Sequence, residues 1–187
     1  MLEVETGHTM LKKVILVVLL IPIVLVLVSL ALPSSYKVER TLVIKAKPEA
    51  VFTLVNTLKQ WPEWSAWTVA RYPDMQITYS GPEAGVGATY SWSGKSSGDG
   101  SLKIASSDPQ TGITYDLDFE HGKYVSKGVL SLRPVEEAVE VKWTNQGELG
   151  WNPVSRYFGL LMDRMMGPDM ETGLRNLQRR VEKAPGS

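Results

Sequence analysis

The chain has 187 residues, which is enough for one ordinary domain and a short additional segment. Lys plus Arg and Asp plus Glu number 20 each, so the net charge is zero and no basic excess indicates binding to nucleic acid. The absence of Cys excludes disulfides, thiol nucleophiles and Cys-based zinc sites. The two histidines, His8 and His121, fall in an N-terminal tail and a predicted turn, so we expect no metal centre and no cofactor.

The N-terminal part of the chain contains one long apolar segment. After a tail at residues 1–13, residues 14–32 carry no charge and are long enough, as a helix, to cross a hydrocarbon core of roughly 30 Å. We therefore expect a transmembrane anchor at 14–32. A cleaved secretory signal is the alternative, because Lys12 and Lys13 precede the apolar segment and the small residues Ser29 and Ala31 lie near its end.

The charges beside this segment predict its orientation. Lys12 and Lys13 adjoin it on the N-terminal side and favour a cytoplasmic N-terminus. We expect a single-pass protein of a bacterial inner membrane, with its domain in the periplasm or otherwise outside the cytoplasm. Residues 33–35 form a short tether, which would keep the domain close to the lipid headgroups.

The region after the tether begins with a predicted strand and two short helices. Residues 37–45 alternate between apolar and polar with a period of two, although Arg40 falls on the apolar side. Pro48 begins a short helix that reaches Asn56, and a second helical piece covers 58–64. Six strands with turn residues between them follow, which is typical of an antiparallel meander. They lie near residues 75–79, 90–92, 102–104, 113–119, 125–132 and 139–143.

The last segment, 153–183, has a helical pattern. Apolar residues recur along it at steps of three or four and predict one long amphipathic helix. Gly167 and Pro168 predict a kink, because proline removes a backbone donor and clashes with the preceding turn. Together these elements predict an α+β domain at 36–183, in which the long helix covers a curved antiparallel sheet, and a C-terminal tail at 184–187.

Several strings within this domain carry a family resemblance. They are VERTLVIKAKPEAVFTLV at 38–55, WPEWSAW at 61–67, GVGATYSWSG at 85–94, GDGSLKIASSDP at 98–109 and WNPVSRYFGLLMDRMMGP at 151–168. They resemble the START-like (SRPBCC, helix-grip) superfamily, and within it the polyketide cyclase/dehydrase-type members. The resemblance implies a helix-grip fold whose sheet curls around a cavity for a lipid, a polyketide or another apolar molecule. The strings mark a fold and are not catalytic signatures.

The candidate ligand cavity consists of residues on the predicted inner face of the sheet and on the long helix. They are Tyr79, Tyr90, Trp92, Ile104, Tyr115, Phe119, Trp143, Phe158, Met162 and Met166. Ordinary core packing is the alternative for each of them. Three tryptophans recur at steps of three, and we interpret them as a packing motif or a cavity rim, with contact to a membrane surface as the alternative. They are Trp61, Trp64 and Trp67.

Catalytic residues are not indicated by the sequence. Asp116, Asp118 and Glu120 form a carboxylate cluster, but they alternate with apolar residues and are predicted to lie on the solvated outer face of a strand. We therefore predict a membrane-anchored protein that binds a hydrophobic small molecule or lipid, with no nucleic-acid partner. No feature identifies a protein partner. One alternative is a polyketide cyclase- or dehydratase-like enzyme in which Tyr90, Tyr115 or Tyr157 donates a proton; the other is an envelope-associated interaction module with a vestigial cavity.

Overall fold

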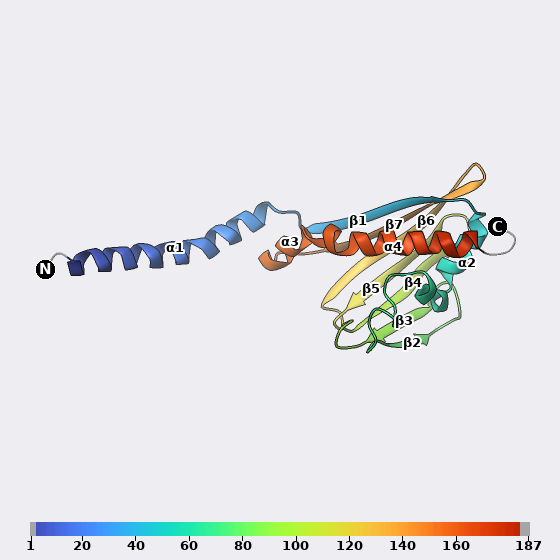
Figure 1. The fold of residues 1–187 in the computed structure, drawn as a ribbon, viewed down its shortest axis with the longest axis horizontal. Coiled ribbons are helices and arrows are strands. Elements are labelled where there is room, and N and C mark those ends of the chain that lie inside the picture. The colour runs from blue at the N-terminus through green and yellow to red at the C-terminus, as the bar shows by residue number, and fades with distance from the viewer. Residues whose placement is uncertain (1–2, 184–187) are drawn as a thin grey trace. The chain divides into compact units, whose positions relative to one another are not determined.

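The computed structural model describes the backbone of residues 3–183, while the side chains of residues 3–9, 11 and 14 are outside the described part. The predicted tail at 184–187 therefore lies outside the described residues, as do most side chains of the predicted tail at 1–13. Figure 1 shows the elements in chain order. They are α1 (Glu3–Ala31), β1 (Ser35–Ile44), α2 (Pro48–Asn56), η1 (Leu58–Glu63), β2 (Gln76–Ser80), β3 (Thr89–Ser93), β4 (Gly100–Asp108), β5 (Gly112–Phe119), β6 (Tyr124–Val135), β7 (Ala138–Glu148), α3 (Pro153–Gly159) and α4 (Met162–Glu182).

The chain divides into two compact units. The first comprises the N-terminal residues up to Ser35 together with Leu149–Leu160, so it contains α1 and α3. The second comprises Tyr36–Glu148 and the residues from Leu161 onward, so it contains the sheet, α2, η1 and α4.

In the first unit, α1 continues through Pro22 without ending. Among the described residues, no helix combines the length and the apolar composition needed to cross a membrane. The transmembrane helix predicted at 14–32 is therefore not supported by the structure. The side chain of Val14, with which the predicted span begins, is not among the described residues.

The helix predicted at 153–183 is in fact two helices. α3 is capped at its N-terminus by Asn152, whose Oδ1 accepts hydrogen bonds from the backbone N–H groups of Val154 and Ser155 at 2.9 and 3.4 Å. It ends in a tight turn in which the N–H of Leu160 donates to the carbonyl of Tyr157. α4 then continues through Pro168. The break in the predicted helix thus lies before Pro168, and the kink predicted at Gly167 and Pro168 stays a prediction.

The second unit is built on one seven-stranded sheet with the order β1-β7-β6-β5-β4-β3-β2. Each strand from β2 to β7 pairs antiparallel with the next, which confirms the predicted meander. Buried and exposed residues alternate along the strands, so one face of the sheet forms the core. The register shifts between Ile104 and Ser106 in β4, and such a bulge adds local bending and twist.

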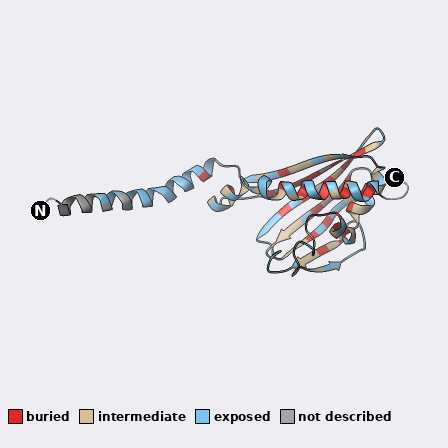
Figure 2. Cartoon of the chain, viewed as in Figure 1, coloured by how far each residue is buried: buried red, intermediate tan, exposed pale blue. Residues whose placement is uncertain are grey.

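α4 lies across the inner face of this sheet (Figure 1), which confirms the helix-grip architecture. Figure 2 shows buried and exposed residues alternating along α4. The buried stripe consists of Met170, Leu174, Leu177 and Val181, together with the glycines Gly167 and Gly173. The core beneath it also contains Trp64 and Trp143, two of the largest fully buried side chains. These contacts fix the helix over the sheet by apolar burial.

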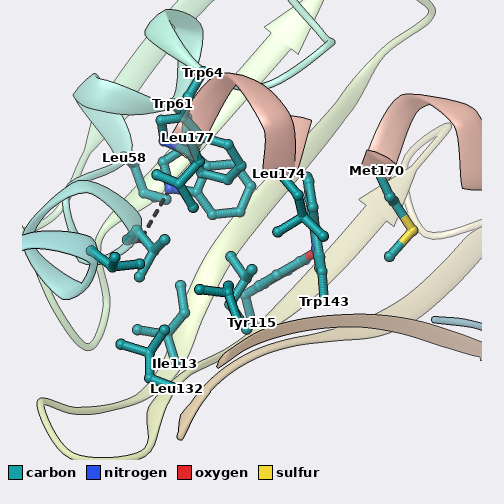
Figure 3. Close-up of a cluster of buried hydrophobic side chains, with 14 of the residues drawn as sticks. Leu58, Trp61, Trp64, Ile113, Tyr115, Leu132, Trp143, Met170, Leu174 and Leu177 are labelled. Carbon is teal, nitrogen blue, oxygen red and sulfur yellow. Dashed lines mark hydrogen bonds between the residues drawn. The ribbon is translucent and has the colours of Figure 1, made fainter. Parts of the chain in front are cut away.

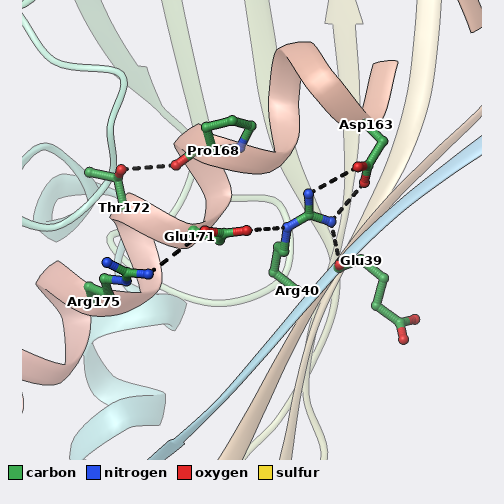
Figure 4. A network of polar contacts seen from close by, with 7 residues as sticks. All are labelled: Glu39, Arg40, Asp163, Pro168, Glu171, Thr172 and Arg175. Carbon is green, nitrogen blue, oxygen red and sulfur yellow. Dashed lines mark hydrogen bonds and ion pairs between the residues drawn. The ribbon is translucent and has the colours of Figure 1, made fainter. Parts of the chain in front are cut away.

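Arg40, which breaks the apolar pattern of β1, is bound by acidic side chains of α4 (Figure 4). Its Nε lies 2.8 Å from Oε1 of Glu171, and its Nη1 lies 2.7 Å from Oδ1 of Asp163. Gly167 lies between these two acids along the helix, and a Cβ at Gly167 would be 1.9 Å from Nη2 of Arg40. Glycine at this position therefore lets the guanidinium approach the helix backbone. Hydrogen bonds from Arg40 lower the pKa of Asp163 below its ordinary value.

Candidate functional site

A cavity of about 140 Å³ lies in the second unit. Its walls come from the inner faces of β3, β4, β5 and β7, from the segment that includes and follows η1, and from α4, which contributes Met166 and Met170. Most of its lining is aromatic or aliphatic, and the polar contributions come from hydroxyl groups and from the amide of Asn145. The cavity is therefore suited to an apolar guest that carries a small number of polar atoms.

Many of the residues that the sequence predicted for a cavity meet at this site. They are Tyr90, Trp92, Tyr115, Phe119, Trp143 and Met166, with Trp61 and Trp67 from the tryptophan segment. They come from three strands, η1, the loop after η1 and α4. The alternation of β3, β5 and β7 explains this convergence, because every second residue of a strand points to the same face of the sheet.

Other predicted residues do not line the cavity. Ile104 and Trp64 are fully buried in the core. Tyr79 lies on the edge strand β2, where its ring centroid is 5.6 Å from that of Tyr90. Met162 packs against the core at the start of α4. Phe158 belongs to α3 in the first unit, because the helical pattern from which it was predicted is interrupted before α4 begins.

Sequence reasoning missed several lining residues, namely Ser65, Tyr72, Met75, Ser97, Leu102, Leu117, Asn145 and Met170. Leu102, Leu117 and Met170 follow the same periodic patterns as the residues that were predicted, so the patterns could have identified them. Asn145 also lies on the inner parity of β7, two residues after Trp143, but an amide there interrupts the apolar pattern. Tyr72 and Ser97 lie in loops, where no periodicity predicts the direction of a side chain.

Tyr115 reaches from β5 across β6 to a partner on β7. Its hydroxyl oxygen accepts a hydrogen bond of 2.8 Å from Nε1 of Trp143. The residue of β6 opposite Tyr115 is Gly128, and a Cβ there would lie 1.9 Å from Cζ of the tyrosine ring. Glycine at this position is what allows the ring to lie over β6. Figure 3 shows Tyr115 and Trp143 side by side beneath Leu174.

A second tyrosine approaches the same part of β7 from the opposite edge of the sheet. The Tyr36 hydroxyl donates to Oδ1 of Asn145 at 3.0 Å, and Nδ2 of Asn145 donates to Oγ of Ser126 at 3.3 Å. Gly147 leaves space for the Tyr36 ring, because a Cβ there would be 2.7 Å from Cε1 of that ring. Asn145 is almost fully buried, and these two hydrogen bonds hold its amide in place at the cavity wall.

Aromatic rings surround this polar group. The Trp61 ring contacts those of Trp64, Tyr115 and Trp143 with centroid distances of 4.9, 5.5 and 6.1 Å. Nε1 of Trp61 donates to the carbonyl of Val55 at 2.9 Å (Figure 3). Among the described side chains, Nε1 of Trp64 is the buried polar atom that has no hydrogen-bond partner. The contacts of the Trp61 ring with these three rings give the wall a fixed shape.

At the other side of the cavity, Trp92 uses the same arrangement as Tyr115. It pairs across the strands with Gly100, and a Cβ on Gly100 would lie 2.3 Å from Cζ2 of the indole. Its ring centroid is 5.2 Å from that of Phe119 and 5.6 Å from that of Tyr90. Glycine on a neighbouring strand therefore accommodates two of the aromatic side chains that line the cavity.

The phenols at the site are kept neutral. Burial raises the pKa of Tyr115 to about 12, against a smaller lowering by its hydrogen bond with Trp143. Burial also raises the pKa of Tyr90 to about 12, with the neighbouring Tyr79 adding to the shift. Both hydroxyl groups therefore carry their protons at neutral pH and can donate a hydrogen bond to a guest.

The structure also places the residues considered for metal binding and acid/base chemistry. Among the residues that the structure describes, no group of three or more His, Asp or Glu side chains is arranged to hold a metal ion. Asp116 and Glu120 are exposed, and Oδ1 of Asp118 accepts a hydrogen bond from the N–H of Gly122. These carboxylates lie outside the cavity lining, as their alternation with apolar residues predicted.

Comparison with known families gives one match over most of the chain. The profile of the family described as "Polyketide cyclase / dehydrase and lipid transport" matches residues 35–182. No curated protein matches the chain.

Solved structures with the same fold are similar to the chain at low identity. The di-domain ARO/CYC StfQ from the steffimycin biosynthetic pathway is 11% identical, with a TM-score of 0.60 over 82% of this chain and 52% of that chain. Ara h 8.0201 is 13% identical, with a TM-score of 0.53 over 80% of this chain and 99% of that one. The Aha1 dimer from Colwellia psychrerythraea is 17% identical, with a TM-score of 0.53 over 80% and 98% of the two chains. These likenesses show the fold alone.

Proposed function

The chain belongs to the polyketide cyclase / dehydrase and lipid transport family, and from this membership we propose that its cavity binds a small hydrophobic molecule or one part of a lipid. The observation that carries the proposal is the cavity itself, which lies under α4 and is lined mainly by aromatic and thioether side chains. Transfer of an apolar molecule from water into such a space is favourable because apolar surface is removed from water.

The size of the cavity limits the guest. An engineered apolar cavity of about 150 Å³ takes up benzene or xenon. The present volume of about 140 Å³ therefore suits a single ring or a short stretch of acyl chain. A larger guest requires the wall to move, and Met75, Met166 and Met170 are the side chains best able to do so, because thioether side chains are flexible and unbranched.

The polar groups of the wall define where a polar atom of the guest would lie. Tyr115 accepts from Trp143 and retains its own proton, so its hydroxyl can donate to a carbonyl or hydroxyl oxygen of a guest. Asn145 is held beside it by Tyr36 and Ser126. We expect the guest to place an oxygen near this pair and its apolar part toward Trp92 and Met166.

Enzymatic cyclisation or dehydration is the second candidate. The specific observation in its favour is the pair of protonated phenols, Tyr90 and Tyr115, in the wall of the cavity. Tyr157, the third phenol considered from the sequence, belongs to α3 and donates to the carbonyl of Leu25. Tyr115→Phe should weaken binding of an oxygen-bearing guest whether the protein is a binder or an enzyme. The two differ in one measurable respect: only if it is an enzyme does the wild-type protein release a chemically altered guest.

Two neighbouring methionines of α4 provide a test of binding. Met166 lines the cavity, whereas Met165 is 54% exposed and does not. We expect the full chain in lipid nanodiscs to bind p-cresol, a single ring with one hydroxyl group, as detected by saturation-transfer NMR. Met166→Trp should fill the cavity and abolish this signal, and Met165→Trp should leave it unchanged. Equal signals from the three proteins, or none from the wild type, would remove the basis for the proposal.

We also propose, from the sequence, that residues 14–32 attach the protein to a lipid bilayer as a single span with a cytoplasmic N-terminus. The support is the uncharged length of this segment and the basic pair Lys12 and Lys13 before it. Fusions after Ser187 test the orientation: alkaline phosphatase should be active there and a cytoplasmic fluorescent protein dark. The opposite pair of results would place the domain in the cytoplasm, and a mature protein that begins near Leu32 would identify a cleaved signal.

A further inference from the structure

In the first unit, α3 is joined to the C-terminal end of α1 by two side chains. Arg156 is only 6% exposed, and its Nη1 lies 3.1, 3.2 and 3.2 Å from the carbonyl oxygens of Ser29, Leu30 and Leu32. The Tyr157 hydroxyl donates to the carbonyl of Leu25 at 2.8 Å. The last carbonyls of a helix have no partner within the helix, and a cation there also interacts favourably with the helix dipole. Arg156 therefore caps α1 and holds α3 beside it.

Residues of α3 and of the positions next to its two ends form an exposed apolar surface. We call this the α3 stripe; it consists of Trp151, Val154, Phe158 and Leu160, which are 81%, 74%, 49% and 57% exposed. Val154 and Phe158 are four residues apart and so lie on one side of α3, and Trp151 comes just before the helix. Its polar residues Arg156 and Tyr157 turn inward to α1. This is the reverse of the usual arrangement in water, where the apolar side of a helix is the covered side.

The neighbouring part of α1 has the same character. All its side chains from Ile15 to Val28 are apolar, and the large ones are each about half exposed. Within the unit, Arg156 donates to the carbonyls of Ser29 and Leu30, and Tyr157 donates to that of Leu25. In a hydrocarbon environment, backbone N–H and C=O groups need hydrogen-bond partners within the protein, and the exposed side chains are apolar. This continuity favours lipid as the occupant of the α3 stripe.

We propose that the α3 stripe inserts into the headgroup region of a lipid bilayer, with Trp151 at the level of the interface. The proposal rests on the proposed attachment of residues 14–32 to the same bilayer. Tryptophan favours this level because its ring is apolar and its N–H can reach water. The guanidinium carbon of Arg156 lies 5.2 Å from the centroid of the Trp151 ring and limits where that ring can lie. The stripe thus adds a second lipid contact beside the end of α1.

Fluorescence quenching tests this contact in the full chain. The protein is reconstituted into phosphatidylcholine vesicles, and vesicle flotation first measures whether it is attached. The Trp151 signal is taken as the difference between the wild type and Trp151→Phe, which leaves the other five of the six tryptophans common to both. We expect lipids brominated near the headgroup to abolish this difference signal, and acrylamide in the aqueous phase to leave it largely intact.

A pair of valines controls for a general effect of removing surface apolar groups. Val154→Ser alters the α3 stripe and should reduce quenching of Trp151 by brominated lipid. Val125→Ser alters a 61% exposed residue of β6 and should not. If the protein floats with the vesicles but brominated lipid does not quench Trp151, the inference is overturned and the attachment of α1 stands. This holds both when acrylamide quenches Trp151 and when a protein surface shields it. Failure to float would overturn both proposals.

Discussion

Gly128→Ala tests the arrangement by which Tyr115 crosses the sheet. A glycine in the interior of a strand is ordinarily less stable than alanine by about 0.5 to 1 kcal/mol, so on propensity alone this substitution should stabilise the protein. The contact with Tyr115 predicts the opposite sign. A Cβ at Gly128 would lie 1.9, 2.2 and 2.3 Å from Cζ, Cε2 and Oη of the ring, whereas ordinary contact begins at 3.4 Å. The ring must retreat by about 1.5 Å.

The consequences of that retreat can be given magnitudes. Forcing an extra carbon into a packed site costs about 1 to 3 kcal/mol. The displaced hydroxyl would also leave Nε1 of Trp143 without its 2.8 Å partner, and an unpaired buried donor costs about 1 to 3 kcal/mol. We therefore expect Gly128→Ala to lower the free energy of unfolding by about 2 to 6 kcal/mol, and Tyr115→Phe, which removes only the hydroxyl, by the second amount alone.

Urea unfolding followed by near-ultraviolet circular dichroism measures both variants. The comparison requires an unchanged slope of free energy against urea, so that a shift in midpoint reports stability. A Gly128→Ala protein at least as stable as the wild type would refute the reasoning, because the ring would then not depend on the missing Cβ. A loss no greater than that of Tyr115→Phe would show that the steric contribution is absent.

Two further outcomes concern ion pairs of α4. Because hydrogen bonds from Arg40 lower the folded-state pKa of Asp163 below 3.8, the stability they contribute is present above that pH and is lost as pH falls through the lowered pKa. The stability difference between wild type and Arg40→Gln should therefore shrink from pH 7 to pH 3 in urea unfolding, and an unchanged difference would contradict this. Nη1 of Arg71 lies 2.6 Å from Oδ1 of Asp169 and joins the loop after η1 to α4, both of which line the cavity. Arg71→Ala should speed release of p-cresol in NMR exchange measurements, whereas Arg175→Ala should not; equal rates would exclude a restraining role for this pair.

The parts of the fold that the sequence predicted correctly depend on local patterns. The alternation in β5 and β7 sets which residues face α4, so Tyr115 and Trp143 could be placed on the inner face without knowledge of their neighbours. Pro48 at the start of α2 is likewise a local signal. These patterns predict the sheet, the covering helix and much of the cavity wall.

The parts that were missed depend on contacts between distant segments. Gly167 and Pro168 are the strongest helix-breaking residues between 153 and 183, yet the chain is interrupted before them, where α3 is bound to the carbonyls of α1 through Arg156. The need for glycine at position 128 also cannot be predicted until the register of β5 against β6, which places Tyr115 opposite it, is known. Asn145 was overlooked because its partners, Tyr36 and Ser126, come from two other strands.

Native mass spectrometry of the full chain, released from membranes without exchange of its bound molecules, tests the central claim most directly. We predict that the wild-type protein carries one apolar molecule or lipid fragment that dissociates on activation, that Met165→Trp carries the same molecule, and that Met166→Trp has the mass of the protein alone. Wild-type protein that is found empty, and that remains empty after incubation with p-cresol, would contradict the claim that the cavity under α4 is a binding site.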